Sequence, residues 1–473
     1  MNRLHFISFL GILLLFFPLA AAIPAGEPTP PEEGTLSEQA QAAALVRAKG
    51  ARCHWPSFGE LKILYMNDLG IRALSGRYVD LYTDLPPNEK TDEMIRLLDA
   101  AVPRLCEFFH LDPREYDSWK ISAFLMTDRE PFEIFGAFDF EEEPIPEFPN
   151  GFSLYDRIWV FDKHQTYYNR FLMLHELVHA FMLQTFGSLD PCWFTEGIAE
   201  FLALHSWDGE KIELGIFPDS PEQVEGFGRI DRIRSRVQAG DTPSVKELLN
   251  LERGAFDNTT TYAWCWALVT LLARNPEYAG PLSALPYLAM EEDPNRQFIK
   301  LLGAKAKSLP ADWQHFAEWI DYGFDFDHKP EVRPRDSIKG DIPDEGITVT
   351  LDAETGSLAT GLILQPGKEY RLSASGRFHI GCRGKVYPCE PNGITLSYFN
   401  SRPIGTLLAE IVPEGATLDE LPIQTEPIGT KGNITPKKQG ELYLRLNIPT
   451  NEIKNSKGTC SVALHAEESA PTE

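Results

Sequence analysis

The chain has 473 residues, which is longer than one ordinary domain, so two or three domains are expected. Its content of 43% hydrophobic and 24% charged residues is typical of a folded globular protein. The formal net charge of −25 argues against nucleic acid, whose phosphates would be repelled, and against electrostatic docking on an anionic membrane.

The first 22 residues have the three parts of a secretory signal peptide. A positive charge at Arg3 precedes an apolar run from Phe6 to Leu19, and small residues follow up to Ala22. The run is shorter than the roughly 20 apolar residues that a membrane-spanning helix needs, which disfavours the alternative of an uncleaved anchor. We therefore expect cleavage near Ala22 and a secreted or periplasmic protein with no membrane span in its mature form.

The next part of the chain predicts a mixed α and β domain. Residues 23–35 are rich in proline and acid and are expected to be a disordered lead-in. Within 36–328, short apolar runs predict strands at 120–126 and 157–161. Apolar residues at helical spacing predict helices at 36–51, 91–109, 171–186, 196–205, 261–273 and 311–322.

The pattern changes after residue 328. A charged, proline-containing linker spans 329–340, and 341–466 shows an all-β pattern before a polar tail at 467–473. The β pattern consists of short alternating runs separated by Gly, Pro and Asn, which predict a sandwich or jelly roll: 348–351, 370–374, 394–398, 441–446 and 460–464. The expected fold class is α+β, with a mostly helical domain that contains a small mixed sheet, followed by an all-β sandwich.

The chain contains seven cysteines, so at least one is free or pairs between chains. Export would permit disulfides. Cys382 and Cys389 flank a glycine and a proline, and their spacing suits a local bridge across a loop. Cys192 and Cys265 are expected to be small buried hydrophobic residues.

The segment 174–180 reads Leu-His-Glu-Leu-Val-His-Ala. His175 and His179 are four positions apart, so on a helix they share one face, where two imidazoles can bind one Zn²⁺. Glu176, beside the first histidine, can act as general base toward a water molecule. The flanking residues are apolar nearly all round, and polar groups buried in such a helix are costly unless they have partners.

An acidic motif follows after one loop. Glu196 lies 17 positions after His179, in an amphipathic helix for which Thr195 is the expected cap. The two histidines and this carboxylate complete a three-ligand site with one position open for water, the pattern of catalytic zinc. Glu200, one turn further, faces the same way and can hydrogen-bond a ligand imidazole. The alternative is that both glutamates only form an exposed face.

These two segments, HELVH and then WFTEGIAEF, resemble the signature of the gluzincin zinc peptidases. That group includes thermolysin and the aminopeptidase N enzymes, and the chain looks most like its peptidase MA-like branch of exported bacterial proteins. The resemblance implies His175, His179 and Glu196 as zinc ligands, Glu176 as catalytic base and Glu200 as a supporting acid. The aminopeptidases' Gly-x-Met-x-Asn strand has no clear counterpart, which favours an endopeptidase.

A group that stabilises the oxyanion of the reaction is also needed. Residues 261–268 (TYAWCWAL) resemble the Tyr-Ala-x-x-Trp-Ala helix of the same branch, which makes Tyr262 the candidate phenolic donor. The equally weighted alternative is a core aromatic residue packed beside two tryptophans. Tyr155 and His205 are weaker candidates. The strand predicted around 152–161 precedes the zinc helix and is a candidate edge for pairing with an extended peptide substrate.

The β domain contains sequence segments that resemble a second family. GLILQPGKEY, PIGTLL, GELYLRLN and NSKGTCSV are similar to segments of the PA-IL-like galactophilic lectins. That resemblance implies a small β-sandwich that binds galactosides through calcium, and hence a carbohydrate or cell-surface ligand.

The calcium loop departs from the lectin pattern. Where the family expects an aspartate, a threonine and a pair of asparagines, this chain has Ile448, Glu452, Asn455 and Ser456. An apolar side chain cannot coordinate calcium, which argues against calcium in this domain. The favoured interpretation is a sandwich that aids targeting or packs against the first domain, and a working lectin is the alternative.

Two functional hypotheses follow from the sequence. The first is an exported zinc endopeptidase that acts on a peptide or protein substrate. The second is a secreted, non-catalytic protein that binds carbohydrate or a surface and carries a vestigial zinc site. Glu176 discriminates between them, because a structural metal site has no need of a base beside its ligand.

Overall fold

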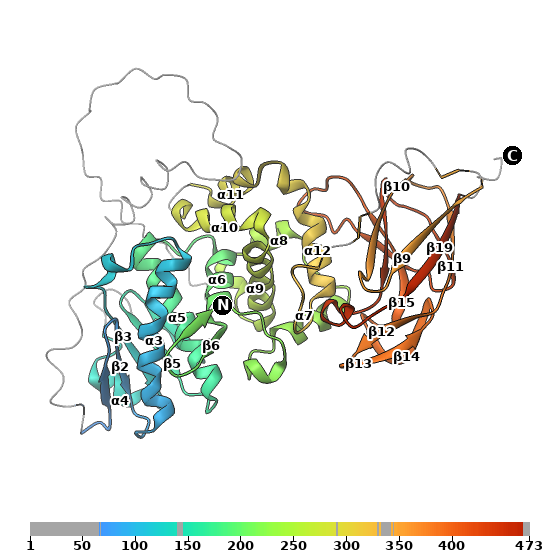
Figure 1. Cartoon of the computed structure of the whole chain (residues 1–473). Helices are drawn as coiled ribbons and strands as arrows, with labels where there is room; N and C mark the ends of the chain where they lie inside the picture. Colours follow the sequence, from blue (N-terminus) through green and yellow to red (C-terminus); the bar gives the residue numbers. More distant parts are fainter. Residues whose placement is uncertain are drawn as a thin grey trace, which may run out of the picture. The chain divides into compact units, whose positions relative to one another are not determined.

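The structure is a computed structural model that describes residues 66, 68–139, 145–289, 292–328, 331–332, 342–343 and 345–466. The expected signal peptide, lead-in, first helix (36–51) and tail lie outside these residues. The described residues form both helices and several sheets, an α+β fold (Figure 1). No helix among them combines the length and apolar character that a membrane span requires.

A five-stranded sheet organises the first part of the chain, with the strand order β1-β2-β3-β5-β4. The central pairs β2–β3 and β3–β5 are parallel, whereas the outer strands β1 and β4 are antiparallel to their neighbours. Strand β4 therefore forms one edge. The strands are β1 (Arg72–Ser75), β2 (Val79–Thr83), β3 (Ile121–Met126), β4 (Gly151–Leu154) and β5 (Arg157–Phe161).

Strand β3 is buried on both faces, which explains its uninterrupted apolar sequence. Ile121, Ala123 and Leu125 face the main core, which also contains residues of α3 (Glu89–Phe108). The alternate residues of β3 face a second, aromatic core, which α4 (Glu130–Phe135) helps to form.

Three long helices follow and carry most of the main core. They are α5 (Thr166–Phe186), α6 (Cys192–Ala203) and α9 (Thr259–Arg274), and α6 contacts both of the others. Each corresponds to a helix predicted from the sequence, although α5 starts five residues earlier than expected. The remaining helices are α7 (Arg229–Gln238), α8 (Val245–Leu249), α10 (Pro276–Leu288), α11 (Pro294–Leu302) and α12 (Leu309–Trp319), with a hairpin of β6 (His205–Trp207) and β7 (Ile212–Leu214).

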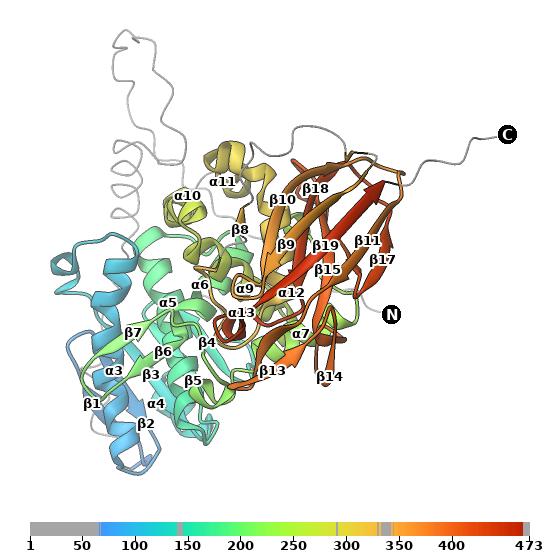
Figure 2. The same cartoon turned by 45° about the vertical axis from the view of Figure 1, so that its right-hand side comes forward.

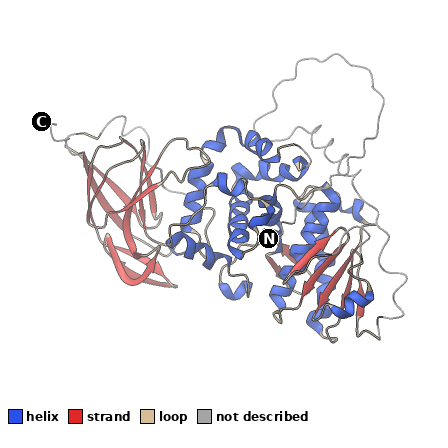
Figure 3. Cartoon of the chain, turned by 180° about the vertical axis from the view of Figure 1, so that it is seen from behind, coloured by secondary structure: helices blue, strands red, loops and turns tan. Residues whose placement is uncertain are grey.

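The last part of the chain, from β8 onward, consists mainly of strands and loops, with a short helix, α13 (Thr450–Ile453) (Figure 3). One sheet has the order β14-β15-β18-β10-β8 with β16 paired to β15, and another has the order β17-β11-β19-β9 (Figure 2). Both contribute to one apolar core. The strands are β8 (Glu331–Val332), β9 (Ile347–Asp352), β10 (Ser357–Leu364), β11 (Tyr370–Ser375), β14 (Asn392–Phe399), β15 (Arg402–Val412), β16 (Gln424–Pro427), β17 (Lys431–Ile434), β18 (Gly440–Leu446) and β19 (Thr459–Ala466).

A separate hairpin contradicts the expected local disulfide. Strands β12 (Phe378–Cys382) and β13 (Lys385–Cys389) pair so that Cys382 lies opposite Lys385 and Cys389 lies opposite Phe378. The two cysteines are therefore at opposite ends of the hairpin, and both are buried free thiols. A disulfide was expected across a loop between these two cysteines. The segment instead forms two paired antiparallel strands, and their register keeps the cysteines apart.

Candidate metal centre

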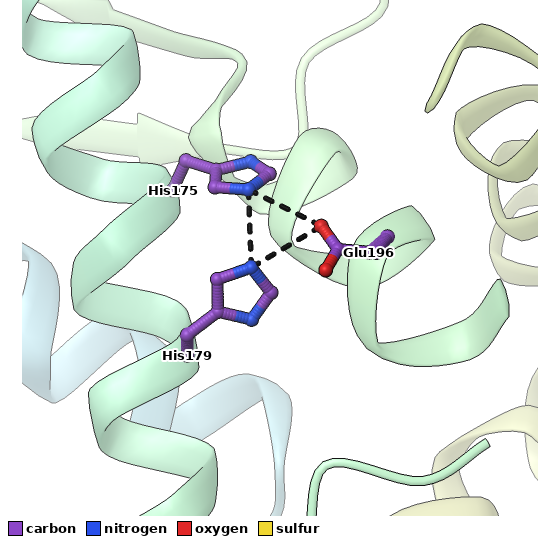
Figure 4. Close-up of side chains that lie close together, drawn as sticks. All are labelled: His175, His179 and Glu196. Atoms are coloured by element: carbon purple, nitrogen blue, oxygen red, sulfur yellow. Dashed lines mark hydrogen bonds and ion pairs between the residues drawn. The ribbon is translucent and has the colours of Figure 1, made fainter. Parts of the chain in front are cut away.

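Helix α5 brings the two histidines together as their spacing predicts. The imidazoles of His175 and His179 lie on one face, with their Nε2 atoms 3.0 Å apart (Figure 4). Both side chains are about 7% exposed, in a helix that is otherwise mostly apolar. The helix ends where Gly187 adopts a left-handed conformation (φ 77°), and the chain then turns toward α6.

Helix α6 supplies the third group but begins earlier than predicted. It starts at Cys192, directly after Pro191, so Thr195 lies inside the helix and does not cap it. The expected cap is wrong because Pro191, with an extended backbone (φ −76°, ψ 148°), is the N-cap, and the helix begins directly after it, about one turn before Thr195. Glu196 then lies on the second turn. Gly197 allows α6 to approach α9, since a Cβ there would lie 2.6 Å from the backbone oxygen of Cys265.

The three side chains converge on one point (Figure 4). Glu196 Oε2 lies 3.4 Å from His175 Nε2 and 3.3 Å from His179 Nε2. All three donor atoms are within 4.8 Å of one another and could hold a metal ion. Glu196 Oε2 and both histidine Nδ1 atoms are buried and have no hydrogen-bond partner. A buried carboxylate oxygen without a partner is costly, so Glu196 Oε2, which lies between the two Nε2 atoms, fits a group that binds between the three side chains.

The side chains of His175, Glu176 and Glu196 shift one another's pKa values. Burial would lower the pKa of His175, but Glu196 and the nearby charges of Glu176 and Glu200 raise it to about 9. Burial would raise the pKa of Glu196, but the two histidines hold it well below its usual range. Burial raises the pKa of Glu176, although the histidines oppose that rise. The site therefore concentrates negative charge, which favours a bound cation.

Glu176 lies against the edge strand of the sheet. A Cβ on Gly151 of β4 would lie 2.6 Å from Glu176 Oε1, so any larger residue would require this carboxylate to shift. The hydroxyl of Ser153, two residues along the same strand, donates a hydrogen bond to Glu176. Sequence reasoning missed both residues. The strand predicted at 152–161 begins one residue after Gly151, so the prediction did not place this glycine in the strand.

A pocket of about 310 Å³ opens over these groups. Strand β4 forms one wall, α6 forms another, and residues between α8 and α9 complete it. Cys192, expected to be buried, is half-buried at its rim. The lining residues are Gly151, Phe152, Ser153, His175, Glu176, His179, Leu189, Cys192, Thr195, Glu196, Arg253, Phe256 and Tyr262.

Tyr262 belongs to this pocket, whereas Tyr155 and His205 do not. The Tyr262 ring centroid is 6.3 Å from that of His175, and burial together with the nearby glutamates raises its pKa. Its phenol therefore keeps its proton and can donate a hydrogen bond. Tyr155 lies in the turn between β4 and β5. His205 is buried outside the pocket, hydrogen-bonded to the backbone oxygen of Ala203 and stacked on a tyrosine.

Glu200 lies near His175, but its main partner is a residue that sequence reasoning missed. Its Oε1 is 3.8 Å from His175 Nδ1, beyond hydrogen-bond distance. Both oxygens of Glu200 accept hydrogen bonds from the guanidinium of Arg229, each at 2.9 Å. No local pattern could have found this contact, because the two residues are 29 positions apart and on different helices.

The loop at residues 447–456, which resembles the lectin calcium site, differs from the cluster on α5 and α6 in its side chains. Ile448 is fully buried in the apolar core of the sandwich. The carboxylate of Glu452 accepts hydrogen bonds from the backbone of Gly384 and the amide of Asn455. Asn447 donates its amide to three backbone oxygens. The polar side chains of Asn447 and Glu452 are therefore hydrogen-bonded to other groups of the protein.

Comparison with known proteins gives weak results. No family model and no curated protein matches the chain. A solved structure titled "EclA N-terminal domain; PllA-like lectin" is 21% identical, with 25% of this chain and 95% of that chain covered and a TM-score of 0.19. One titled "IMPa metallopeptidase in complex with T-antigen" is 11% identical, with 58% of this chain covered and a TM-score of 0.16. This chain spans only 27% of the IMPa structure. TM-scores this low carry no weight for fold or function.

Proposed function

We propose that the protein is an exported zinc-dependent peptidase of the gluzincin type. The observation that carries this proposal is the convergence of His175, His179 and Glu196 within 4.8 Å, with Glu176 beside them in the same pocket. A purely structural metal site would need no acid beside its ligands, and Gly151 lets this acid lie close to β4 without a shift. The proposal takes residues 36–328 as the peptidase domain.

Zinc fits the donors better than other common metals do. Imidazole nitrogens and a carboxylate are typical zinc ligands, at bond lengths of about 2.0–2.1 Å. A tetrahedron with such bonds has edges of about 3.3–3.4 Å. The three donor atoms are separated by 3.0, 3.3 and 3.4 Å, close to those edges. Three protein ligands leave a fourth position open, as in catalytic zinc sites.

The residues around the metal position have defined tasks in peptide hydrolysis. Bound zinc would supply Lewis-acid chemistry, polarising the scissile carbonyl and making a water molecule more acidic. Glu176 takes a proton from the attacking water and delivers it to the leaving amine as the C–N bond breaks. Ser153 holds the Glu176 carboxylate through its hydrogen bond. The phenolic O–H of Tyr262 donates a hydrogen bond to the developing oxyanion and keeps its proton.

The same pocket favours an endopeptidase. Strand β4 is an edge strand, so its free backbone groups can pair with an extended peptide substrate. An aminopeptidase must bind the charged amino terminus of its substrate, which requires a carboxylate when water is excluded. Among the described residues that line the pocket, the acids are Glu176 and Glu196, and both are already assigned. A free amino terminus would therefore lack a partner.

We assign the β domain, residues 341–466, as a PA-IL lectin-like sandwich that aids substrate targeting. Its phrases that resemble the lectins lie on β10, β15, β18 and β19, which build the shared core. Ile448 argues against calcium there. The second candidate function, a secreted carbohydrate- or surface-binding protein with a vestigial zinc site, rests on the same phrases. The signal peptide predicted at 1–22 supports secreted or periplasmic localisation for either function.

A single preparation tests the peptidase proposal. The mature protein is studied as purified, after treatment with a chelator, and after zinc is added back. In each of these three states the zinc content is measured, together with cleavage of casein and of a peptide library. We expect cleavage within the peptides that disappears with the metal and returns with zinc. Zinc at one ion per chain without cleavage of any peptide would favour the non-catalytic alternative.

A further inference from the structure

Arg229 and Glu200 form a buried ion pair behind the metal donors. Arg229 is the first residue of α7, is about 7% exposed and donates from Nε and Nη2 to the two oxygens of Glu200, which is about 2% exposed. Two parallel hydrogen bonds fix the carboxylate in direction as well as in position. The Glu200 carboxylate therefore has a defined orientation rather than a range of rotamers.

The fixed carboxylate faces one of the proposed ligands. Glu200 Oε1 lies 3.8 Å from Nδ1 of His175, and this Nδ1 is buried with no hydrogen-bond partner of its own. The opposite nitrogen of the ring, Nε2, is the one directed at Glu196 and His179. An acceptor near Nδ1 determines which nitrogen carries the proton, and hence which nitrogen offers its lone pair.

The surroundings keep water away from this arrangement. The guanidinium of Arg229 lies over the ring of Phe227, 5.4 Å from its centroid. Phe227 packs against Phe171, whose ring in turn lies 6.3 Å from that of His175. Buried ion pairs contribute little net stability, because apolar residues of similar volume often do as well or better. The position of this pair therefore calls for an explanation other than stability.

We propose that Arg229 is a positioning residue for the metal centre. It holds Glu200 opposite His175, so that Nδ1 carries the ring proton and Nε2 presents its lone pair to the metal. This inference rests on the proposed zinc site and adds a residue to it. An arginine suits the task because its planar fork grips both carboxylate oxygens, whereas a lysine offers a single charged point.

The test is zinc affinity, measured by competition with a chelator of known affinity, in R229K. This variant keeps the charge but cannot grip both oxygens, and we expect zinc affinity to fall about 10-fold, as for other residues that orient a ligand. The matched control is R445K. Arg445 and Glu410 form another buried pair, each side chain 3% exposed, between β18 and β15 of the sandwich. We expect R445K to bind zinc as tightly as the wild type.

A second variant covers the case in which R229K does not fold. E200Q/R229M replaces the ion pair with neutral side chains of similar size, which proteins usually tolerate. We expect it to unfold near the wild-type temperature but to bind zinc at least about 10-fold more weakly. Wild-type zinc affinity in either folded variant would overturn the role of Arg229. A wild type that binds zinc but cleaves no peptide would overturn the proposed peptidase and leave this inference standing.

Discussion

The two regions whose sequences resemble metal-binding families differ in what occupies the donor positions. On α5 and α6, three donor atoms lie within 4.8 Å of one another, and this is the cluster among the described residues that could hold a metal. In the β domain, the position of the expected aspartate is Ile448, which is fully buried in the apolar core. Glu452 nearby is already hydrogen-bonded to Gly384 and Asn455.

This difference shows why the two resemblances do not have equal value. A site on regular helices is largely specified by spacing, because residues four apart share a face whatever surrounds them. A site on a loop requires each oxygen ligand individually, so one apolar replacement removes it while the sandwich itself persists. Similar sequence phrases can therefore preserve a fold without preserving its ligand.

The largest expected effect comes from removing a donor in each region. In Glu196→Ala, zinc affinity should fall by more than the roughly 10- to 100-fold typical of residues that only support ligands, and hydrolysis should be lost. Glu452→Ala is the matched change in the β domain and should leave both properties unchanged. Zinc affinity and casein hydrolysis check the two variants. Equal losses in both would break the distinction between the regions.

The next effect concerns the oxyanion donor. In Tyr262→Phe, kcat should fall about 100-fold with zinc content unchanged, because a hydrogen bond to the developing charge is lost. Tyr167→Phe is the control, since that hydroxyl bonds to the backbone of His205 outside the pocket. Steady-state kinetics on one peptide check the prediction. Wild-type kcat in Tyr262→Phe would support the alternative that this ring only packs.

A smaller effect is expected at the edge strand. In Gly151→Ala, the added methyl group would lie 2.6 Å from Glu176 Oε1 and must displace the base, so kcat should fall about 10-fold with zinc retained. Gly254→Ala, where a Cβ would meet nothing within 4 Å, should be as active as the wild type. The ratio of the two kcat values measures the effect. No difference between them would mean that Glu176 is not held against β4.

The smallest effect is expected from calcium. Because Ile448 replaces an oxygen ligand, millimolar calcium should leave the unfolding temperature of the wild type unchanged. Differential scanning calorimetry with and without calcium checks this, and magnesium serves as the control. A rise in unfolding temperature specific to calcium would show that other oxygen atoms of the loop bind the ion. It would contradict the claim that the β domain has lost its metal site.

Much of the helical part could be predicted from the sequence. The long apolar run around His175 and His179 located α5, because a run of this length exceeds that of a strand. The polar Thr195 does not mark the start of α6, because Pro191 is the N-cap and the helix begins directly after it. The disulfide expected between Cys382 and Cys389 failed because spacing along the chain does not reveal the register of a hairpin.

The groups that surround the metal donors could not be predicted in the same way. Arg229 reaches Glu200 from another helix, and Ser153 reaches Glu176 from the edge strand of a sheet. Such contacts depend on how separate elements pack, which local spacing does not encode. Gly151 lies just before the strand predicted at 152–161, and its close approach to the Glu176 carboxylate appears only in three dimensions.

The most direct test of the central claim is the turnover of Glu176→Gln at zinc content equal to that of the wild type. Glutamine keeps the size of the side chain but cannot accept the proton of the attacking water, so kcat should fall at least about 1,000-fold on a peptide that the wild type cleaves. Zinc content, measured on the same samples, should be one ion per chain in both. Full turnover in the variant would contradict the role of Glu176 as base and, with it, the proposed peptidase mechanism.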